Sequence, residues 1–176
     1  MELSRTYQIA ELLGEPEVNG DIRRDWGSLE ASYGKGLPDD YKWFVSAYGS
    51  GCVNDQLYFF HPRAVIGDQG LRIESLWEQA AYSYGELVRS SPELYPCPIY
   101  PEKSGCIPVA RSVSGNYVLL MPPGSESKEW RVVVDMGSWV ILDVNFTDFL
   151  YTALRGKLFV PVIEGDPFER IGEIEP

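Results

Sequence analysis

The stretch LPDDYKWFVSAYGSG, from Leu37 to Gly51, predicts a helix with defined ends. Pro38 suits the first helical turn, where its missing N–H would have lacked a partner. Asp39 and Asp40 follow, at the end of a helix where the dipole favours negative charge. Because adjacent residues on a helix point about 100° apart, the two aspartates do not naturally share one substrate atom. The pair therefore indicates the start of a helix rather than a catalytic dyad.

The same stretch contains a regular stripe of apolar side chains. The residues that share helical spacing, and that should face the core, are Tyr41, Phe44, Val45 and Tyr48. Lys42 and Ser46 should then point to solvent, and Gly49 should end the helix. Trp43 falls beside the stripe, so we expect it to be available to a partner.

Four more helices are predicted from apolar spacing and from residues that suit helix ends. Ser4 can cap a helix that ends near Leu13, and Asp21 can cap a second one that ends at Gly34. The longest candidate is LRIESLWEQAAYSYGELVRS, residues 71–90, in which Gly85 is a weak point. The last is NFTDFLYTALRG, residues 145–156.

Short apolar runs predict strands, most of them in the second half of the chain. A buried strand is expected over 56–60, and Gly115 and Gly137 are placed for two hairpins. The predicted hairpin strands are 106–111, 116–121, 130–135 and 139–144. Residues 90–105 contain four prolines and should form an ordered crossover. We therefore predict an α+β fold of one domain over 1–176, with a central antiparallel sheet and helices packed against it.

The charge of the chain restricts its partners. With 15 basic and 26 acidic side chains, the formal net charge is −11. A net anionic surface disfavours nucleic acid and anionic membranes, and it suits a cationic protein partner as well as a protein whose charge simply keeps it soluble. The first residues do not resemble a secretory signal, and no run approaches the roughly 20 apolar residues of a membrane span. Three cysteines without a CxxC pair are typical of a reduced, cytoplasmic protein.

The residues offer little support for catalysis. His61 is the only histidine, and no nucleophile signature, P-loop or dinucleotide motif accompanies it. A hydrolase that uses Asp39, Asp40 or His61 is the weakest of three hypotheses. One histidine and scattered cysteines do not predict a metal site, and no cofactor is expected. Three other acids, expected at the surface, are Asp55, Asp68 and Asp135.

Taken in order, these features resemble the SUKH superfamily, which includes the Knr-like cell-wall regulators and bacterial immunity proteins. The resemblance runs from about 22 to 156. It rests on the Leu37–Gly51 stretch after an amphipathic helix, on IPVA with Gly115 and Asn116, and on Phe149-Leu150. Asn116 stands where the family often has aspartate. A helix over 4–13 and an acidic extension over 157–176, expected to be exposed, are additions to this core.

The resemblance implies an α+β domain without catalytic residues that binds another protein. The leading hypothesis is an immunity protein, a monomer or weak dimer, that neutralises a cationic bacterial toxin, often a nuclease in such systems. The alternative is a regulatory or scaffold protein of the Knr-like type with a non-toxin partner. The residue types suited to anchoring and steering a partner are exposed aromatics and acids. The partner-binding candidates are Asp39, Asp40, Trp43, Asp55, Tyr82 and Tyr95.

Overall fold

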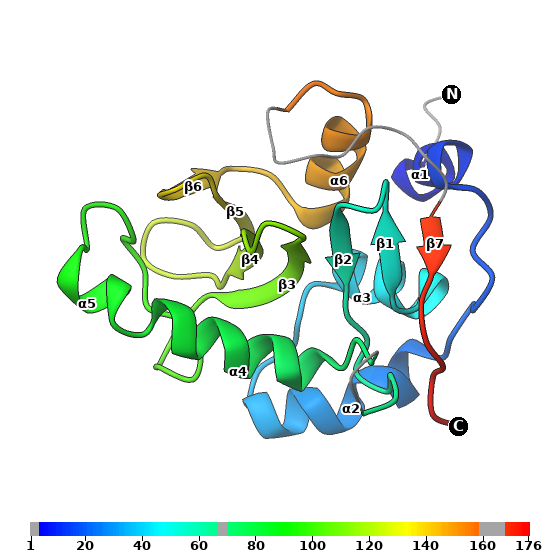
Figure 1. Ribbon diagram of the computed structural model, residues 1–176, viewed down its shortest axis with the longest axis horizontal. Coiled ribbons are helices and arrows are strands. Elements are labelled where there is room, and N and C mark those ends of the chain that lie inside the picture. The colour runs from blue at the N-terminus through cyan, green and yellow to red at the C-terminus, as the bar shows by residue number, and fades with distance from the viewer. Residues whose placement is uncertain (1–3, 67–69, 159–167) are drawn as a thin grey trace.

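An antiparallel sheet forms the centre of the protein. The computed structural model describes residues 4–66, 70–158 and 168–176, and these contain seven strands in the order β6-β5-β4-β3-β2-β1-β7 (Figure 1). Every neighbouring pair is antiparallel. The strands are β1 Gly51–Val53, β2 Leu57–Phe59, β3 Ile107–Ser112, β4 Tyr117–Met121, β5 Arg131–Asp135, β6 Trp139–Leu142 and β7 Phe168–Arg170. The predicted α+β class is confirmed, and so is the predicted meander of three or four strands, which has four, β3 to β6.

The described residues also form six helices, several with the predicted caps. They are α1 Arg5–Leu13, α2 Ile22–Tyr33, α3 Asp39–Tyr48, α4 Ile73–Tyr84, α5 Leu87–Ser90 and α6 Phe146–Leu154. The side chains of Ser4, Asp21 and Asn145 accept hydrogen bonds from backbone amides in the first turns of α1, α2 and α6. These local signals explain why the sequence predicts the helix starts well.

Helices cover both faces of the sheet. On one face, Phe59 of β2 contacts Phe44 of α3, with ring centroids 4.9 Å apart, and Phe146 of α6, at 6.3 Å. On the opposite face, Tyr84 of α4 meets Tyr117 of β4, at 5.3 Å. Figure 1 shows α4 along the near side of the molecule and α3 behind β1 and β2. The core therefore consists of two layers of side chains, one on each side of the sheet.

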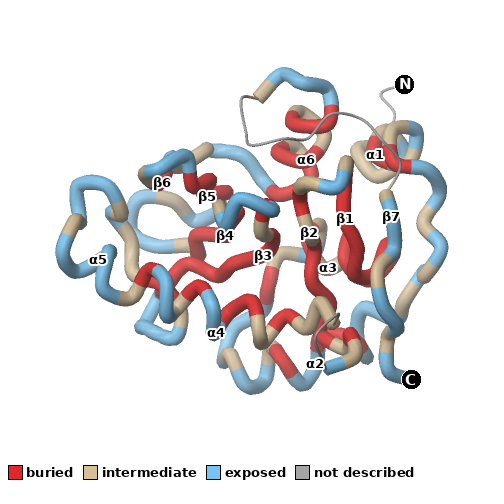
Figure 2. Tube along the Cα trace, in the orientation of Figure 1, coloured by how far each residue is buried: buried red, intermediate tan, exposed pale blue. Residues whose placement is uncertain are grey.

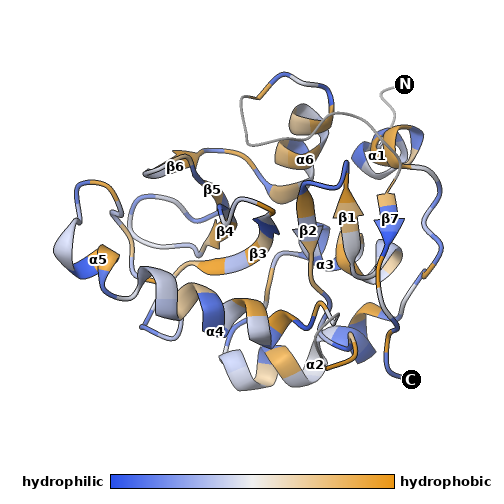
Figure 3. Ribbon diagram, viewed as in Figure 1, coloured by the Kyte–Doolittle hydropathy of each residue, from blue (hydrophilic) through white to orange (hydrophobic). Residues whose placement is uncertain are grey.

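Figure 2 shows that the central strands and the inner sides of the helices are buried, whereas β7 at the edge of the sheet is mostly exposed. Figure 3 shows hydrophobic residues along β1 and α6, whereas β7 ends in hydrophilic residues. The predicted stripe of α3 is confirmed, because all four of its members are buried: Tyr41, Phe44, Val45 and Tyr48.

The prediction that Ser46 points to solvent is wrong. Ser46 is buried, and its hydroxyl accepts a 3.0 Å hydrogen bond from the indole N–H of Trp26 in α2. Lys42 is only half-buried, and its ammonium group lies 2.9 Å from the carboxylate of Glu30. The helix α3 also begins one residue later than expected, since Pro38 is its N-cap. Contacts between α2 and α3 therefore cover more of α3 than the apolar stripe suggests.

Two further expectations need correction. The helix predicted over 71–90 is two helices, because α4 ends at Tyr84 and α5 begins at Leu87. Gly85, a poor helix former, lies at the break. Asp135 was expected at the surface but is buried, where its carboxylate accepts hydrogen bonds from the hydroxyl of Tyr84 and the backbone amide of Gly137. Asp68 lies outside the described residues.

The C-terminal residues contribute an unpredicted strand. β7 pairs with β1 along its whole length, and the ring of Phe168 contacts those of Phe44 and Tyr48 at 6.0 and 5.3 Å. Most side chains of 168–176 are exposed as expected, but the segment is tied to the domain by its backbone. Residues 159–167 of the extension lie outside the described residues.

Candidate functional site

An acidic cleft of about 750 Å³ opens where the first turns of α3 and α6 meet. The loop before β5 and the loop between β6 and α6 complete its walls. Its lining residues are Leu37, Pro38, Asp39, Asp40, Glu129, Trp130, Asp143, Val144, Asn145, Phe146 and Asp148. Five of these residues are acids, and none is basic. The cleft therefore presents negative charge around a partly apolar floor.

The positions of several acids follow from helix electrostatics. Asp39 and Asp40 lie in the first turn of α3, and Asp148 lies in the first turn of α6. The positive end of each helix dipole favours a carboxylate at these places. Because α3 and α6 begin side by side, the two sets of acids converge on one cleft.

Two of the acids are engaged within the protein. The Oδ2 of Asp40 accepts hydrogen bonds from the backbone amide and the hydroxyl of Thr147, at 2.9 and 3.3 Å. The Oδ1 of Asp148 lies 2.6 Å from the guanidinium of Arg5. Both carboxylates hold α6 in place, so they contribute to the shape of the cleft more than to its free charge.

Three acids leave their charge available to a partner. The side chain of Asp39 is 98% exposed and has one partner, the ammonium group of Lys42, at 3.2 Å. Glu129 and Asp143 are exposed, and within the described part of the chain neither forms an ion pair. Trp130 lies next to Glu129, half-buried against the core. An acidic rim beside an indole ring suits a cationic, partly apolar segment of another protein.

The structure brings together only two of the six predicted partner-binding residues. Asp39 and Asp40 line the acidic cleft, whereas Trp43 packs beside Phe44 and Tyr48 at the margin of the core. Asp55 is exposed in the turn between β1 and β2. None of the last four candidates, Trp43, Asp55, Tyr82 and Tyr95, lines the cleft.

Tyr82 and Tyr95 differ from one another. Tyr82 is 91% exposed on the outer side of α4, as an anchor for a partner would be. Tyr95 is half-buried and packs against Tyr84 and Trp139, with centroids 5.8 Å away in each case. The aromatic ring of Tyr95 thus belongs to the core of the sheet.

Three lining residues, Glu129, Trp130 and Asp143, were not predicted as site residues. They lie in two loops about a hundred positions after Asp39, so no local pattern connects them. One sequence feature could have indicated Trp130 as a site residue: it follows the acidic residue Glu129 and begins a predicted strand. Only the fold shows that these loops meet α3.

A second groove, of about 630 Å³, separates α2 from α4. Leu29, Trp77 and Tyr100 form its apolar floor, and Glu74 and Glu78 lie on the α4 wall. The indole N–H of Trp77 is already bonded to the carbonyl of Pro108, at 3.0 Å. This groove is less acidic than the cleft and is separate from it.

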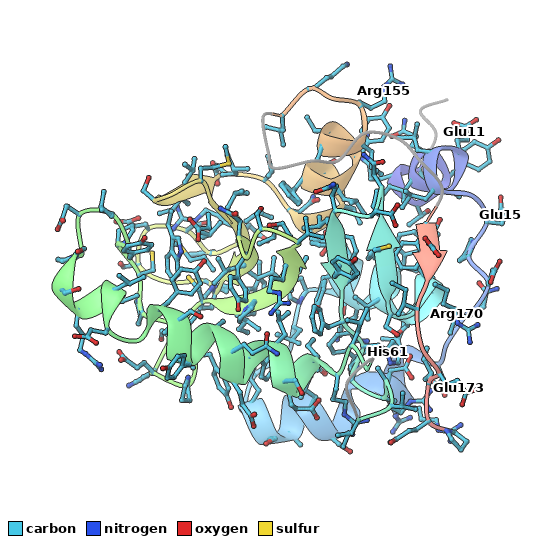
Figure 4. The ribbon with its side chains drawn as sticks, in the orientation of Figure 1. Glu11, Glu15, His61, Arg155, Arg170 and Glu173 are labelled. Carbon is cyan, nitrogen blue, oxygen red and sulfur yellow. The ribbon has the colours of Figure 1, made fainter. Side chains whose placement is uncertain are left out.

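His61 lies in a buried polar cluster that the sequence does not predict. Figure 4 labels His61, which follows β2 in the chain. Its side chain has no exposed surface, its Nδ1 accepts a hydrogen bond from the backbone amide of Arg63, and its Nε2 is 3.6 Å from Oδ2 of Asp25. The guanidinium of Arg63 lies 2.6 Å from Oδ1 of the same buried Asp25. Burial lowers the pKa of His61 from 6.5 to about 4, although Asp25 opposes the shift. His61 is thus neutral at pH 7, and it does not line the cleft that Asp39 and Asp40 line.

One group of possible metal ligands occurs among the described residues. Ligand atoms of Cys52, Asp55 and Glu169 lie within 4.8 Å of one another. Cys52 is buried, and both carboxylates are exposed. Three ligands of this mixed kind fall short of the four that a structural zinc site uses.

The fold and the cleft define the class of protein: an α+β domain whose clearest surface feature is an acidic recess. A sequence model of the SMI1 / KNR4 family (SUKH-1) matches residues 24–152, well over half of the chain. The protein therefore belongs to this family, as the resemblance indicated. No curated protein and no solved structure matches the chain. Among the described helices, none combines the length and apolar character that a membrane crossing requires.

Proposed function

We propose that this protein is a non-enzymatic binding domain, and that it acts as an immunity protein that neutralises a cationic toxin. The observation that carries the proposal is the acidic cleft, in which Asp39, Glu129 and Asp143 surround Trp130. Such a recess can receive lysine or arginine side chains, with the carboxylates steering the encounter and the indole ring, over which the ammonium group of Lys35 already lies at 5.8 Å, offering apolar surface. A nuclease is one suitable target, because an enzyme that binds nucleic acid displays basic side chains.

Membership of the SMI1 / KNR4 family supports a binding role at the level of the family, and the net charge of −11 supports a basic partner. A regulatory or scaffold role with a basic, non-toxin partner is the second candidate. It uses the same cleft, so the two candidates differ in the partner and not in the chemistry of recognition.

The decisive experiment mixes the purified protein with the toxin domain encoded beside its gene. We expect a stable complex by size-exclusion chromatography and loss of toxic activity at equal concentrations. The absence of binding at micromolar concentrations to any neighbouring toxin would overturn the immunity role. Recovery of a basic, non-toxin protein in affinity purification, from cells without such a toxin gene, would support the regulatory role instead.

A further inference from the structure

Two of the three cysteines lie side by side on the crossover between the two halves of the chain. The backbone amide of Cys106 donates a 2.7 Å hydrogen bond to the carbonyl of Pro98, and the amide of Tyr100 donates a 3.0 Å bond to the carbonyl of Cys106. Ile99 and Cys106 form a parallel bridge. These bonds place Cys106 beside the segment from Pro98 to Tyr100, which directly follows Cys97.

The two thiols differ in their access to solvent. Cys97 is half-buried and lines a pocket of about 310 Å³, whereas Cys106 is fully buried and is not among the residues that line it. Prolines 96, 98, 122 and 123 line much of the pocket. A small molecule that enters the pocket therefore reaches the sulfur of Cys97 before that of Cys106.

Arg131 brings positive charge to the same pocket. One guanidinium nitrogen, Nη2, lies 3.0 Å from the sulfur of Met121 and 3.6 Å from the carboxylate of Glu126. Its Nε is buried and has no hydrogen-bond partner among the described residues. The Nε–H of the guanidinium is thus an unused hydrogen-bond donor. It can stabilise a thiolate in the pocket and the hydroxide that leaves a peroxide when the thiolate attacks it.

The electrostatics of the pair separate the two sulfurs into different roles. The neighbouring thiol of Cys106 lowers the pKa of the Cys97 thiol, burial and the carboxylate of Glu126 oppose the shift, and Arg131 lowers the pKa further. The neighbouring thiol of Cys97 and burial raise the pKa of Cys106. Since the thiolate is the nucleophile, Cys97 is the sulfur that reacts first.

We propose that Cys97 and Cys106 form a redox modification site, at which hydrogen peroxide oxidises Cys97 and Cys106 then closes an intramolecular disulfide. In the first step the Cys97 thiolate attacks one peroxide oxygen, the O–O bond breaks, and the departing hydroxide takes a proton to become water. The sulfur is thereby oxidised to a sulfenic acid. In the second step the sulfur of Cys106 attacks that of Cys97, an S–S bond forms, and the sulfenic hydroxyl leaves as water with the proton of Cys106. Two thiols and one molecule of hydrogen peroxide give one disulfide and two molecules of water.

Cys52 provides an internal comparison. It is buried, and its pKa is raised by burial and by the carboxylates of Glu169 and Asp55. A buried thiol without positive charge nearby reacts slowly. Oxidation should therefore leave Cys52 as a thiol while it links the other two cysteines.

The test treats the folded full-length protein with a small excess of hydrogen peroxide at neutral pH and follows intact mass over time. We expect a loss of two hydrogens, and a peptide that links Cys97 to Cys106 after digestion without reductant. Cys106→Ser should stop at a sulfenic acid on Cys97 that a dimedone probe labels, and Cys97→Ser should slow the reaction about tenfold or more. Arg131→Lys, which keeps the charge, should react faster than Arg131→Gln.

The matched control is Cys52→Ser, which should form the disulfide at the wild-type rate. Several results would overturn the proposal: no linked peptide in the wild-type protein, a Cys97→Ser variant that reacts as fast as wild type, or dimedone labelling of Cys52 ahead of Cys97. Circular dichroism of each variant establishes that the fold is intact. The test needs no toxin, so its outcome is independent of the proposed binding function.

Discussion

The carboxylate of Asp40 caps a helix that starts far along the chain, because its Oδ2 accepts a 2.9 Å hydrogen bond from the backbone amide of Thr147, 107 positions later. The other oxygen accepts the amide of Tyr41, at 2.9 Å, within its own helix. One side chain thus joins the starts of α3 and α6 and fixes the width of the acidic cleft between them.

Replacing Asp40 with alanine should lower the free energy of unfolding by about 1–2 kcal/mol, the usual cost of losing a helix cap. Asp39, its exposed neighbour, is the matched control, and Asp39→Ala should change stability by less than about 0.5 kcal/mol. Urea unfolding monitored by tryptophan fluorescence measures both. Equal effects of the two substitutions would show that the bond from Thr147 contributes nothing.

Removing the charge of the cleft should weaken partner binding without unfolding the protein. The triple variant Asp39→Asn, Glu129→Gln and Asp143→Asn should raise the Kd for the cationic partner on the order of tenfold and reduce its salt dependence. The control neutralises three exposed acids elsewhere: Glu11, Glu86 and Glu93. Titration by calorimetry at two salt concentrations separates the cases. Equal weakening by both triples would mean that net charge, and not the cleft, attracts the partner.

The buried cluster of Asp25, His61 and Arg63 predicts a pH dependence of stability. The pKa of His61 is about 4 in the folded protein, below its ordinary value of 6.5. Between these values the unfolded chain binds the proton and the folded protein does not. The contribution of His61 to the free energy of unfolding should therefore be fully present above about pH 6.5. It should fall by up to about 3 kcal/mol as the pH drops toward 4.

The variant His61→Asn keeps an acceptor near the amide of Arg63 and cannot titrate. Its free energy of unfolding, measured from pH 7 to 4, should change less than that of the wild-type protein. The other charged groups around His61, which are Asp25, Arg63 and Arg72, remain in both proteins. Parallel curves for the two proteins would assign the acid sensitivity to carboxylates instead.

The bond between Tyr84 and buried Asp135 should contribute measurably to stability. Tyr84→Phe removes the hydroxyl donor from a buried carboxylate and should cost about 1–3 kcal/mol. Tyr82→Phe is the control two positions earlier, where the side chain is 91% exposed and a neutral effect is expected. Thermal unfolding of the two variants makes the comparison.

Substituting alanine for glycine should have opposite effects on stability at Gly51 and at Gly27. A Cβ on Gly51 would lie 2.2 Å from the backbone oxygen of Glu169, so Gly51→Ala should separate β7 from β1 and destabilise the protein. A Cβ on Gly27, in the exposed middle of α2, would meet nothing within 4 Å, so Gly27→Ala should stabilise by about 0.5–1 kcal/mol. Hydrogen exchange at the amide of Ile171, bonded to Ser50, reports on the first case. Unchanged protection there would contradict it.

The helices and the four-stranded meander could be predicted because their signals are local. Asp21 and Gly34 bound α2, Asn145 caps α6, and Gly115 and Gly137 adopt positive φ of 86° in the predicted hairpins. The resemblance that began with Leu37–Gly51 was confirmed by the family match.

Features that depend on distant partners could not be predicted. β7 has three residues, and its pairing with β1, more than a hundred positions earlier, defines it as a strand. Ser46 is buried under Trp26 of α2, whose indole N–H donates a hydrogen bond to it. Asp135 is buried under Tyr84 of α4, whose hydroxyl donates a hydrogen bond to its carboxylate. The cleft could not be predicted for the same reason, because its walls come from loops that only the folded sheet brings together. Of the six candidate site residues, two line it.

The pairing of β7 with β1 also bears on self-association. An exposed sheet edge is a template on which a second chain can add a strand, and long, flat, apolar edges are the most prone to it. Here the last strand is only three residues long and carries Glu169 and Arg170, both exposed. Without that strand, the backbone of β1, with Cys52 and Val53, would form the edge. The short charged strand thus protects the apolar part of the sheet from aggregation by strand addition.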